Sequence, residues 1–198
     1  MDKKRLIIGM SGASGAPLTV EVLNRLRERP EIETHLVVTR GAEMTLRSES
    51  DVSVETLRSY ASVYHPIDEI GASIASGSFR TMGMIVVPCS MKTAAGIHSG
   101  YSDNLLLRAA DVCLKERRKL VLVVRESPLS TLHLRNLYEL SQMGAVILPP
   151  MLTYYQRPSS LEDCTRQMVQ RILSQFDLDD TAYEWRGMVV FPPIQPSG

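Results

Sequence analysis

The chain has 198 residues, and its 22 basic and 22 acidic side chains give a formal net charge of zero; this length suits one domain with a sizeable core. A chain without excess positive charge is not expected to have nucleic acid as its main partner, because a phosphate backbone calls for a basic surface. The three cysteines are widely spaced and form no CxxC pair, which argues against a disulfide framework or a zinc site and predicts no bound metal. No signal-peptide segment and no apolar stretch of about 18 residues occurs, so we expect a cytoplasmic protein that does not span a membrane.

Short apolar segments of strand length recur along the chain, and each is a nearly continuous run rich in Val, Ile and Leu. Continuous rather than alternating patterns are typical of strands buried on both faces of a parallel sheet. These segments cover residues 6–10, 35–39, 84–88, 120–124 and 145–148. Apolar stripes at helical spacing lie between them, over residues 18–26, 54–61, 103–116, 130–143 and 160–176. The alternation predicts an α/β fold with a doubly wound, mostly parallel sheet of Rossmann or flavodoxin type in a single domain.

Two parts of the chain are less regular. Residues 64–82 form a long excursion before the third predicted strand. Residues 188–198 are rich in proline and are expected to form a loose tail, so the predicted domain covers residues 1–187.

The first strand ends in the small-residue turn GMSGASGAP, residues 9–17. Small residues allow a sharp turn and a close backbone approach to a ligand, and the helix that follows is expected to present free N–H groups to an anion. The hydroxyls of Ser11 and Ser14 add further donors. The same pattern also suits a tight strand-to-helix turn without a ligand, and both interpretations stay open.

The third predicted strand ends in PCSMKT, where a second helix begins. Ser90 and Thr93 are candidate donors to a phosphate or to ring heteroatoms, and Lys92 offers a cation. Cys89 is interpreted as a small buried residue rather than a nucleophile.

Charged side chains follow in the next helix and strand. Arg108, Asp111 and Lys115 share one helical face, and sequence alone favours a solvated ion-pair ladder over a cationic binding surface. Arg125 and Glu126 come directly after the fourth strand, at the edge where ligands bind in this fold. Burial raises and a neighbouring cation lowers the pKa of a carboxyl group such as that of Glu126.

The last segments supply Tyr154 and Tyr155 after a Pro-Pro pair, and Arg171 beside the apolar arc of the final helix. Taken alone, Arg171 is interpreted as a surface residue whose stem packs on the edge of the core. His133 is interpreted as a structural hydrogen-bonding residue.

Together these segments resemble the flavin prenyltransferase family, the UbiX-like proteins, and most of all its subgroup associated with phenolic (hydroxyarylic) acid decarboxylases. The likeness covers about residues 5–187. It rests on the segments GMSGASGAP, SESD, SGSFRTMGMIVVPCSMKTAAGI, RAADVCLKERRKLVLVVRE, PLSTLHLRN and GAVILPPM.

The resemblance implies an enzyme that joins a dimethylallyl group from dimethylallyl phosphate to N5 and C6 of reduced FMN, and supplies prenylated FMN to a UbiD-type decarboxylase. It implies a homo-oligomer, a dodecamer in the family, and no metal. Implied FMN contacts are Gly12, Ala13, Ser14, Thr39, Ser90, Met91, Lys92, Thr93 and Arg125. Implied contacts to dimethylallyl phosphate are Lys115, Arg125, Tyr155 and Arg171. Ser14, Glu49 and Glu126 are the implied catalytic residues, with Ser14 near N5 and the two carboxylates as acid/base groups.

The chain departs from the family pattern in three places. Leu152-Thr153-Tyr154-Tyr155 replaces the more common Phe-Tyr, Glu184-Trp185 replaces Arg-Trp near the C-terminus, and Arg135 replaces a glutamate. The first changes a pocket surface and the second removes a cation near an expected lid.

Three other functions compete with this one. Flavin-dependent cysteine decarboxylases share the fold and the first glycine-rich turn, but their Met-Asn-rich segment is missing from this sequence. Direct decarboxylation of phenolic acids fits the phosphate-binding residues less well. A non-catalytic FMN-binding carrier protein would not need Glu126, Tyr155 and Arg171, and all three are present.

Overall fold

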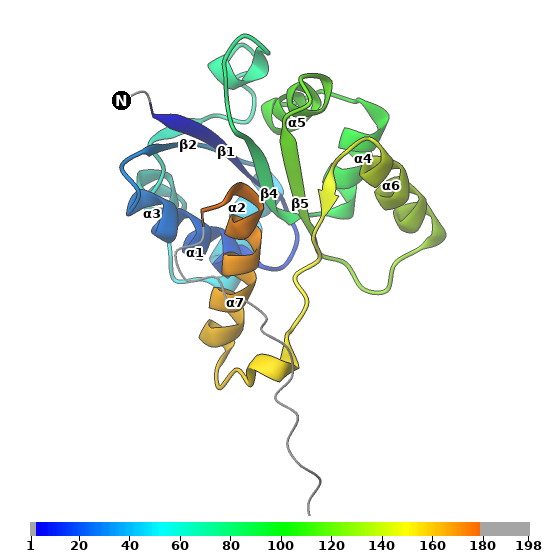
Figure 1. The fold of residues 1–198 in the computed structure, drawn as a ribbon. Helices are drawn as coiled ribbons and strands as arrows, with labels where there is room; N and C mark the ends of the chain where they lie inside the picture. The colour runs from blue at the N-terminus through cyan, green and yellow to red at the C-terminus, as the bar shows by residue number, and fades with distance from the viewer. Residues whose placement is uncertain (1–2, 179–198) are drawn as a thin grey trace, which may run out of the picture.

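The computed structural model describes residues 3–178, which form a six-stranded sheet in the order β3-β2-β1-β4-β5-β6 with helices on both faces (Figure 1). All five strand pairings are parallel, which confirms the predicted doubly wound α/β class. The predicted boundary at residue 187 and the proline-rich tail lie outside the described residues.

The central strands are buried along nearly their whole length, as continuous apolar runs require in a sheet covered on both faces. The strands are β1 (Lys4–Met10), β2 (Ile32–Val38), β3 (Val63–His65), β4 (Gly83–Cys89), β5 (Lys119–Val124) and β6 (Val146–Ile147). Each of the five predicted apolar segments overlaps one of them. The short edge strand β3 was not predicted, because Val63–His65 is too short to show a pattern and lies at the start of the irregular region.

The helices form two layers, and each layer buries its own apolar cluster against one face of the sheet. One cluster receives side chains from α1 (Ala16–Arg27), α2 (Arg40–Glu49), α3 (Val54–Ser59) and α7 (Leu161–Leu173). The other receives them from α4 (Met91–Ser99), α5 (Leu105–Lys115) and α6 (Thr131–Gln142). Three 3₁₀ turns complete the described chain: η1 (Ser73–Ala75), η2 (Tyr154–Gln156) and η3 (Ser174–Phe176).

Helix α2 has no counterpart among the predicted helices, because its apolar signal is weak. Only Ala42 and Leu46 of this helix are buried, so no apolar stripe marks it. The local signal that could have located it is the N-cap, where the Thr39 hydroxyl accepts a hydrogen bond from the Ala42 N–H at 3.2 Å.

The excursion before β4 is held by arginines of α5 and the turn after it. Arg118 donates to the carbonyl oxygens of Phe79 and Gly77. Arg108 donates to the Ala75 carbonyl and pairs with Asp111. Arg108 therefore has the structural role that the ion-pair interpretation of this face predicted.

None of the helices among residues 3–178 is both long enough and apolar enough to cross a bilayer. The same part of the chain holds no group of three or more His, Cys, Asp or Glu side chains arranged to bind a metal ion.

Two buried histidines join the edge strand β3 to its neighbour β2. His35 Nδ1 lies 3.0 Å from His65 Nε2, and His35 Nε2 lies 2.9 Å from Glu33 Oε1. Burial lowers the pKa of His65 from 6.5, the nearby His35 lowers it further, and Glu69 only partly opposes them. The folded protein therefore takes up this proton at a lower pH than the unfolded chain does.

We expect this pair to make stability depend on pH. The contribution of His65 is complete above about pH 6.5 and is lost as the pH falls through its lowered folded pKa, with a slope of at most about 1.4 kcal/mol per pH unit for one proton. Urea unfolding at several pH values between 7 and 5 should show a shallower slope for His65→Gln than for the wild type. Equal slopes would assign the pH dependence to other groups.

Candidate functional site

The turn between β1 and α1 needs glycine at two positions. Gly15 has φ 121°, a backbone conformation that residues with a Cβ rarely adopt. A Cβ on Gly12 would lie 3.0 Å from the backbone carbonyl carbon of Gly41, so this turn packs directly on the first turn of α2. Gly12 is thus placed beside the start of α2, whose N-cap is Thr39.

Glu49, the last residue of α2, also binds the turn between β1 and α1. Its Oε2 accepts hydrogen bonds from the N–H groups of Gly15 at 2.8 Å and Ala16 at 3.0 Å, and its carboxylate also accepts one from Ser14. This corrects the expectation that the start of α1 presents free N–H groups to an anionic ligand. The helix dipole and two of these donors already stabilise a carboxylate of the chain itself.

Glu49 is held as an anion by these contacts. Burial raises the pKa of its carboxyl, but the hydrogen bonds from Ser14, Gly15 and Ala16 and the charge of Arg125 outweigh it and leave the pKa below its usual value. Ser14 after β1 and Arg125 after β5 therefore both act on Glu49 at the end of α2, although the three segments lie far apart in the sequence.

Ser11 does not have the role expected for it. Its side chain is buried, and its hydroxyl donates to the Pro88 carbonyl at 3.0 Å and accepts from the Ser90 N–H at 2.8 Å. It is therefore committed to the end of β4 and is not an available donor to a ligand.

The start of α4 combines backbone donors with one exposed cation. Ser90 caps the helix by accepting from the Thr93 N–H at 3.3 Å, and its hydroxyl donates to Thr93 Oγ1 at 3.1 Å. The first N–H groups of a helix have no acceptor within it, and in α4 these belong to Met91 and Lys92. The Lys92 side chain is exposed, whereas those of Met91 and Thr93 are buried, so the latter two can contact a ligand chiefly through backbone atoms.

Cys89, just before this helix, is an inert residue. It is fully buried, and burial raises the pKa of its thiol to about 12. A thiol with so high a pKa supplies almost no thiolate at neutral pH, in agreement with its interpretation as a small core residue.

Arg125 and Glu126 follow β5 at the same edge of the sheet and are exposed. The Arg125 N–H donates to the Cys89 carbonyl at 3.1 Å, which ties this segment to the start of α4. Glu126 Oε1 accepts from the neighbouring Ser127 N–H at 3.0 Å. The edge thus brings together hydroxyls, backbone N–H groups, two cations and two carboxylates, a set suited to binding an anion and moving protons.

Three predicted residues lie away from this cluster in the same chain. Lys115 is the last residue of α5, four residues before β5 begins, and pairs with Glu116. It therefore lies at the end of the sheet where the strands begin, opposite the end where the cluster lies. Arg171 is exposed on the C-terminal half of α7, which leads to Phe176 beside Gly83, the first residue of β4. Tyr155 is exposed in η2, on a segment that extends beyond the sheet between β6 and α7 (Figure 1).

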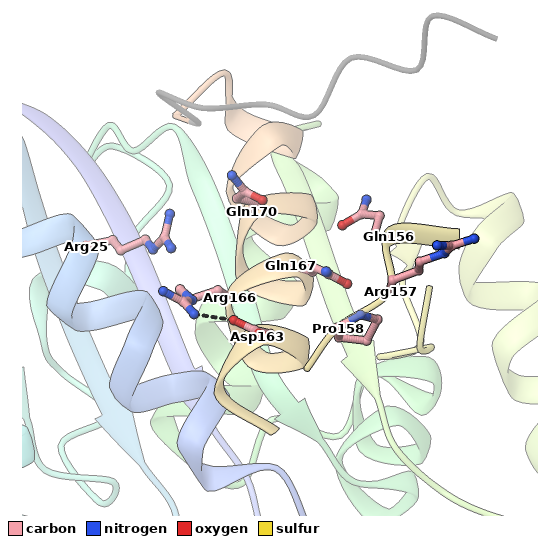
Figure 2. A pocket seen from close by; sticks show the side chains of 8 residues that line it. All are labelled: Arg25, Gln156, Arg157, Pro158, Asp163, Arg166, Gln167 and Gln170. Carbon is pink, nitrogen blue, oxygen red and sulfur yellow. Dashed lines mark hydrogen bonds and ion pairs between the residues drawn. The ribbon is translucent and has the colours of Figure 1, made fainter. Parts of the chain in front are cut away.

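This segment also shapes a hollow that the sequence did not indicate. A cavity of about 550 Å³ lies between α1, η2 and α7 and is lined by Arg25, Gln156, Arg157, Pro158, Asp163, Arg166, Gln167 and Gln170 (Figure 2). Two of its three arginines are paired: Arg25 with Glu21 at 2.8 Å, and Arg166 with Asp163. Hydrogen bonds from Ser159 and Arg166 lower the pKa of Asp163 to about 2, so this carboxylate stays charged. None of the predicted site residues lines the cavity.

Of the departures from the family pattern, Leu152 is about half exposed, and Thr153 donates to Gln167 at 2.9 Å, which ties the segment to α7. Arg135 is exposed on α6. Glu184 and Trp185 lie outside the described residues.

Comparisons with known proteins agree with this architecture. Residues 1–174 match the Flavoprotein family. The flavin prenyltransferase UbiX of Escherichia coli strain K12 is 50% identical over 187 residues, which cover 93% of this chain and 99% of that protein. A dodecameric FMN-dependent UbiX-like decarboxylase from Escherichia coli O157:H7 has a crystal structure with a TM-score of 0.90 and 50% identity, covering 93% of this chain and 100% of that one. The structure of AnUbiX (PadA1) in complex with FMN and dimethylallyl pyrophosphate has a TM-score of 0.88 and 48% identity, covering 92% of this chain and 99% of that one.

Proposed function

This chain belongs to the Flavoprotein family and, within it, to the UbiX-like flavin prenyltransferases, and from that membership we propose the reaction that it performs. It transfers a dimethylallyl group from dimethylallyl phosphate to N5 and C6 of reduced FMN. The allylic C–O bond breaks, bonds to N5 and C6 form, and one proton leaves with the phosphate, so the flavin gains C₅H₈. The product is the prenylated cofactor of a UbiD-type decarboxylase, and the enzyme works in the cytoplasm.

The observation that carries this proposal is that the segments after β1, β4 and β5 meet where the strands end: Glu49 binds the turn that holds Ser14, and the Arg125 N–H binds the end of β4. The residues there fit FMN. Gly12 and Ala13 permit close approach of the backbone, and Ser14, Thr39 and Ser90 offer hydroxyls. The start of α4 adds the N–H groups of Met91 and Lys92 and the exposed Lys92 ammonium, and Thr93 is a further assigned contact. Reduced FMN supplies the electron-rich ring positions that are alkylated.

Arg125 binds the phosphate group of dimethylallyl phosphate. A guanidinium forms paired hydrogen bonds with phosphate oxygens, and a fixed cation favours departure of phosphate from carbon more strongly in a water-poor site than in bulk water. The charge of Arg125 also lowers the pKa of Glu49, so the same cation influences the group that handles the proton.

Ser14, Glu49 and Glu126 are the proposed catalytic residues. Glu49 is anionic and accepts a hydrogen bond from the Ser14 hydroxyl, so the carboxylate fixes the position of that hydroxyl. Loss of the proton at C6 during ring closure needs a positioned base, and the candidate bases are Glu49 at the end of α2 and Glu126 just after β5.

Lys115, Tyr155 and Arg171 complete the donor site from other subunits. Within one chain Lys115 and Arg171 lie toward the opposite edge of the sheet, and Tyr155 lies on a segment that extends away from it. A homo-oligomer like the dodecameric relative would bring such residues of one copy to the strand ends of another. In that arrangement the three side chains contribute two further cations and a phenol to the phosphate of the donor.

The reaction is tested by anaerobic incubation of the protein with reduced FMN and dimethylallyl monophosphate, followed by mass spectrometry of the released flavin. A flavin heavier by C₅H₈ is the expected result. Unmodified FMN released from a protein that binds it would contradict the proposed reaction and favour a carrier function. A parallel reaction with the diphosphate distinguishes the two donors.

Arg171→Ala is expected to raise the KM for dimethylallyl phosphate by about tenfold or more, because an ion-paired hydrogen bond to the phosphate is lost, while FMN affinity stays the same. Arg166→Ala is the matched control: it removes an arginine five residues earlier on α7 that is paired with Asp163, and it should leave this KM unchanged. An equal effect of both variants on KM would remove Arg171 from the donor site.

A further inference from the structure

The end of β4 is irregular at the point where it leads into α4. Its pairing with β5 is regular from Gly83↔Lys119 to Val86↔Leu122 and then shifts, so that Cys89 pairs with Val124. One extra residue is therefore accommodated in β4, and the pairing with β1 has already ended at Val86. A bulge of this kind leaves backbone groups outside the ladder.

The carbonyl groups of Val87 and Pro88 fall in this irregular stretch, and both residues are fully or almost fully buried. Buried carbonyl groups need hydrogen-bond donors. Two hydroxyls supply these donors, one from α1 and one from the residue after β1. Thr19 donates to the Val87 carbonyl at 2.5 Å, and Ser11 donates to the Pro88 carbonyl at 3.0 Å. Both side chains are almost completely buried.

The two hydroxyls differ in one respect. Thr19 binds the Val87 carbonyl within β4, whereas Ser11 Oγ also accepts the Ser90 N–H at 2.8 Å. The Ser11 N–H also donates a hydrogen bond to the Pro88 carbonyl, at 3.1 Å. Ser90 in turn caps α4 through the Thr93 N–H. A continuous chain of hydrogen bonds thus runs from the glycine-rich turn to the first turn of α4.

We propose that Ser11 is a positioning residue for the flavin: its hydroxyl fixes the first turn of α4 relative to the glycine-rich turn, so that the two segments contact one flavin together. Gly12–Ser14 follow Ser11 directly in the chain, and Ser90–Thr93 are attached to it through the Ser90 N–H. One buried hydroxyl therefore sets the spacing of two segments that are about 80 residues apart in sequence. The inference rests on the proposed FMN site, since these two segments are its assigned contacts.

Ser11→Ala tests this role, and Thr19→Val is the matched control, because it removes the neighbouring buried hydroxyl bond without touching Ser90. FMN binding is measured by fluorescence titration, and stability by thermal unfolding without FMN. Ser11→Ala should weaken FMN binding by about tenfold, the factor that corresponds to one ordinary buried hydrogen bond. Thr19→Val should lower the melting temperature comparably but leave FMN affinity within about twofold of the wild type. Ser11→Cys keeps the volume of the side chain and serves the same purpose if the alanine variant fails to fold. Wild-type affinity in a folded Ser11 variant would overturn the proposal.

A readout without ligand keeps this inference separate from the proposed function. Hydrogen exchange of the Ser90 amide in the FMN-free protein should speed up by about tenfold or more in Ser11→Ala and stay unchanged in Thr19→Val. If the wild type fails to bind FMN, the proposed function fails while this comparison still tests whether Ser11 holds the start of α4. Unchanged exchange in Ser11→Ala would refute that role.

Discussion

Glu49→Gln should slow prenyl transfer by about 10²- to 10⁴-fold, the range typical of losing a positioned acid/base group. Glutamine keeps the size of the side chain, and its amide oxygen can still accept from the Gly15 and Ala16 N–H groups that now bind Glu49. It carries no charge, however, and cannot take up a proton. FMN affinity should change by no more than a few-fold, and single-turnover anaerobic assays with bound FMN measure the chemical step directly.

Glu126→Gln is the natural comparison, because Glu126 is exposed and its substitution leaves the glycine-rich turn untouched. We expect it to retain FMN binding and to lose prenyl transfer as well. Full activity of this variant together with an inactive Glu49→Gln would assign the proton transfer to Glu49 alone. Full activity of both would contradict the proposed acid/base roles.

Gly83→Ala should lower the free energy of unfolding by at least about 3 kcal/mol, which places it among the severe single substitutions. Gly83 opens β4 with φ 144°, and a Cβ there would lie 2.1 Å from the backbone carbonyl oxygen of Lys119 and 3.1 Å from the Phe176 ring. The backbones of Gly83 and Lys119 cannot easily move apart, because Gly83 is paired with Leu6 of β1 on one side and with Lys119 of β5 on the other. Urea unfolding monitored by circular dichroism gives the change.

Gly71→Ala is the matched control for this prediction. No atom lies within 4 Å of a Cβ built on Gly71, and its φ lies outside the left-handed range, so its effect should stay within about 0.5 kcal/mol. Similar stability of the two variants would mean that the strand start can shift to accept a methyl group, contrary to its central position in the sheet.

Patterns along the chain were enough to establish the class of fold and the segments where ligands are expected to bind. Parallel strands buried on both faces are nearly continuous apolar runs, so β1, β2, β4 and β5 could be recognised from such runs. The apolar run over residues 145–148 also located the partly buried edge strand β6. Ligand-binding segments in this fold follow the strands, which identified GMSGASGAP, PCSMKT and the Arg125-Glu126 pair. Two elements without such a signal were missed: β3 is too short to show a pattern, and α2 buries only Ala42 and Leu46.

Only the tertiary structure shows which of these polar groups contact one another. No spacing in the sequence indicates that Glu49 binds the start of α1 and so takes up donors that the motif was expected to offer a ligand. Nor does any local pattern show that Ser11 is turned inward to Ser90, that His35 meets His65, or that Lys115 and Arg171 lie toward the far edge of the sheet. Local patterns fix secondary structure and burial, because these depend on neighbours in the chain. The partners of a polar side chain depend on how strands and helices pack, and that is settled only when the whole sheet is assembled.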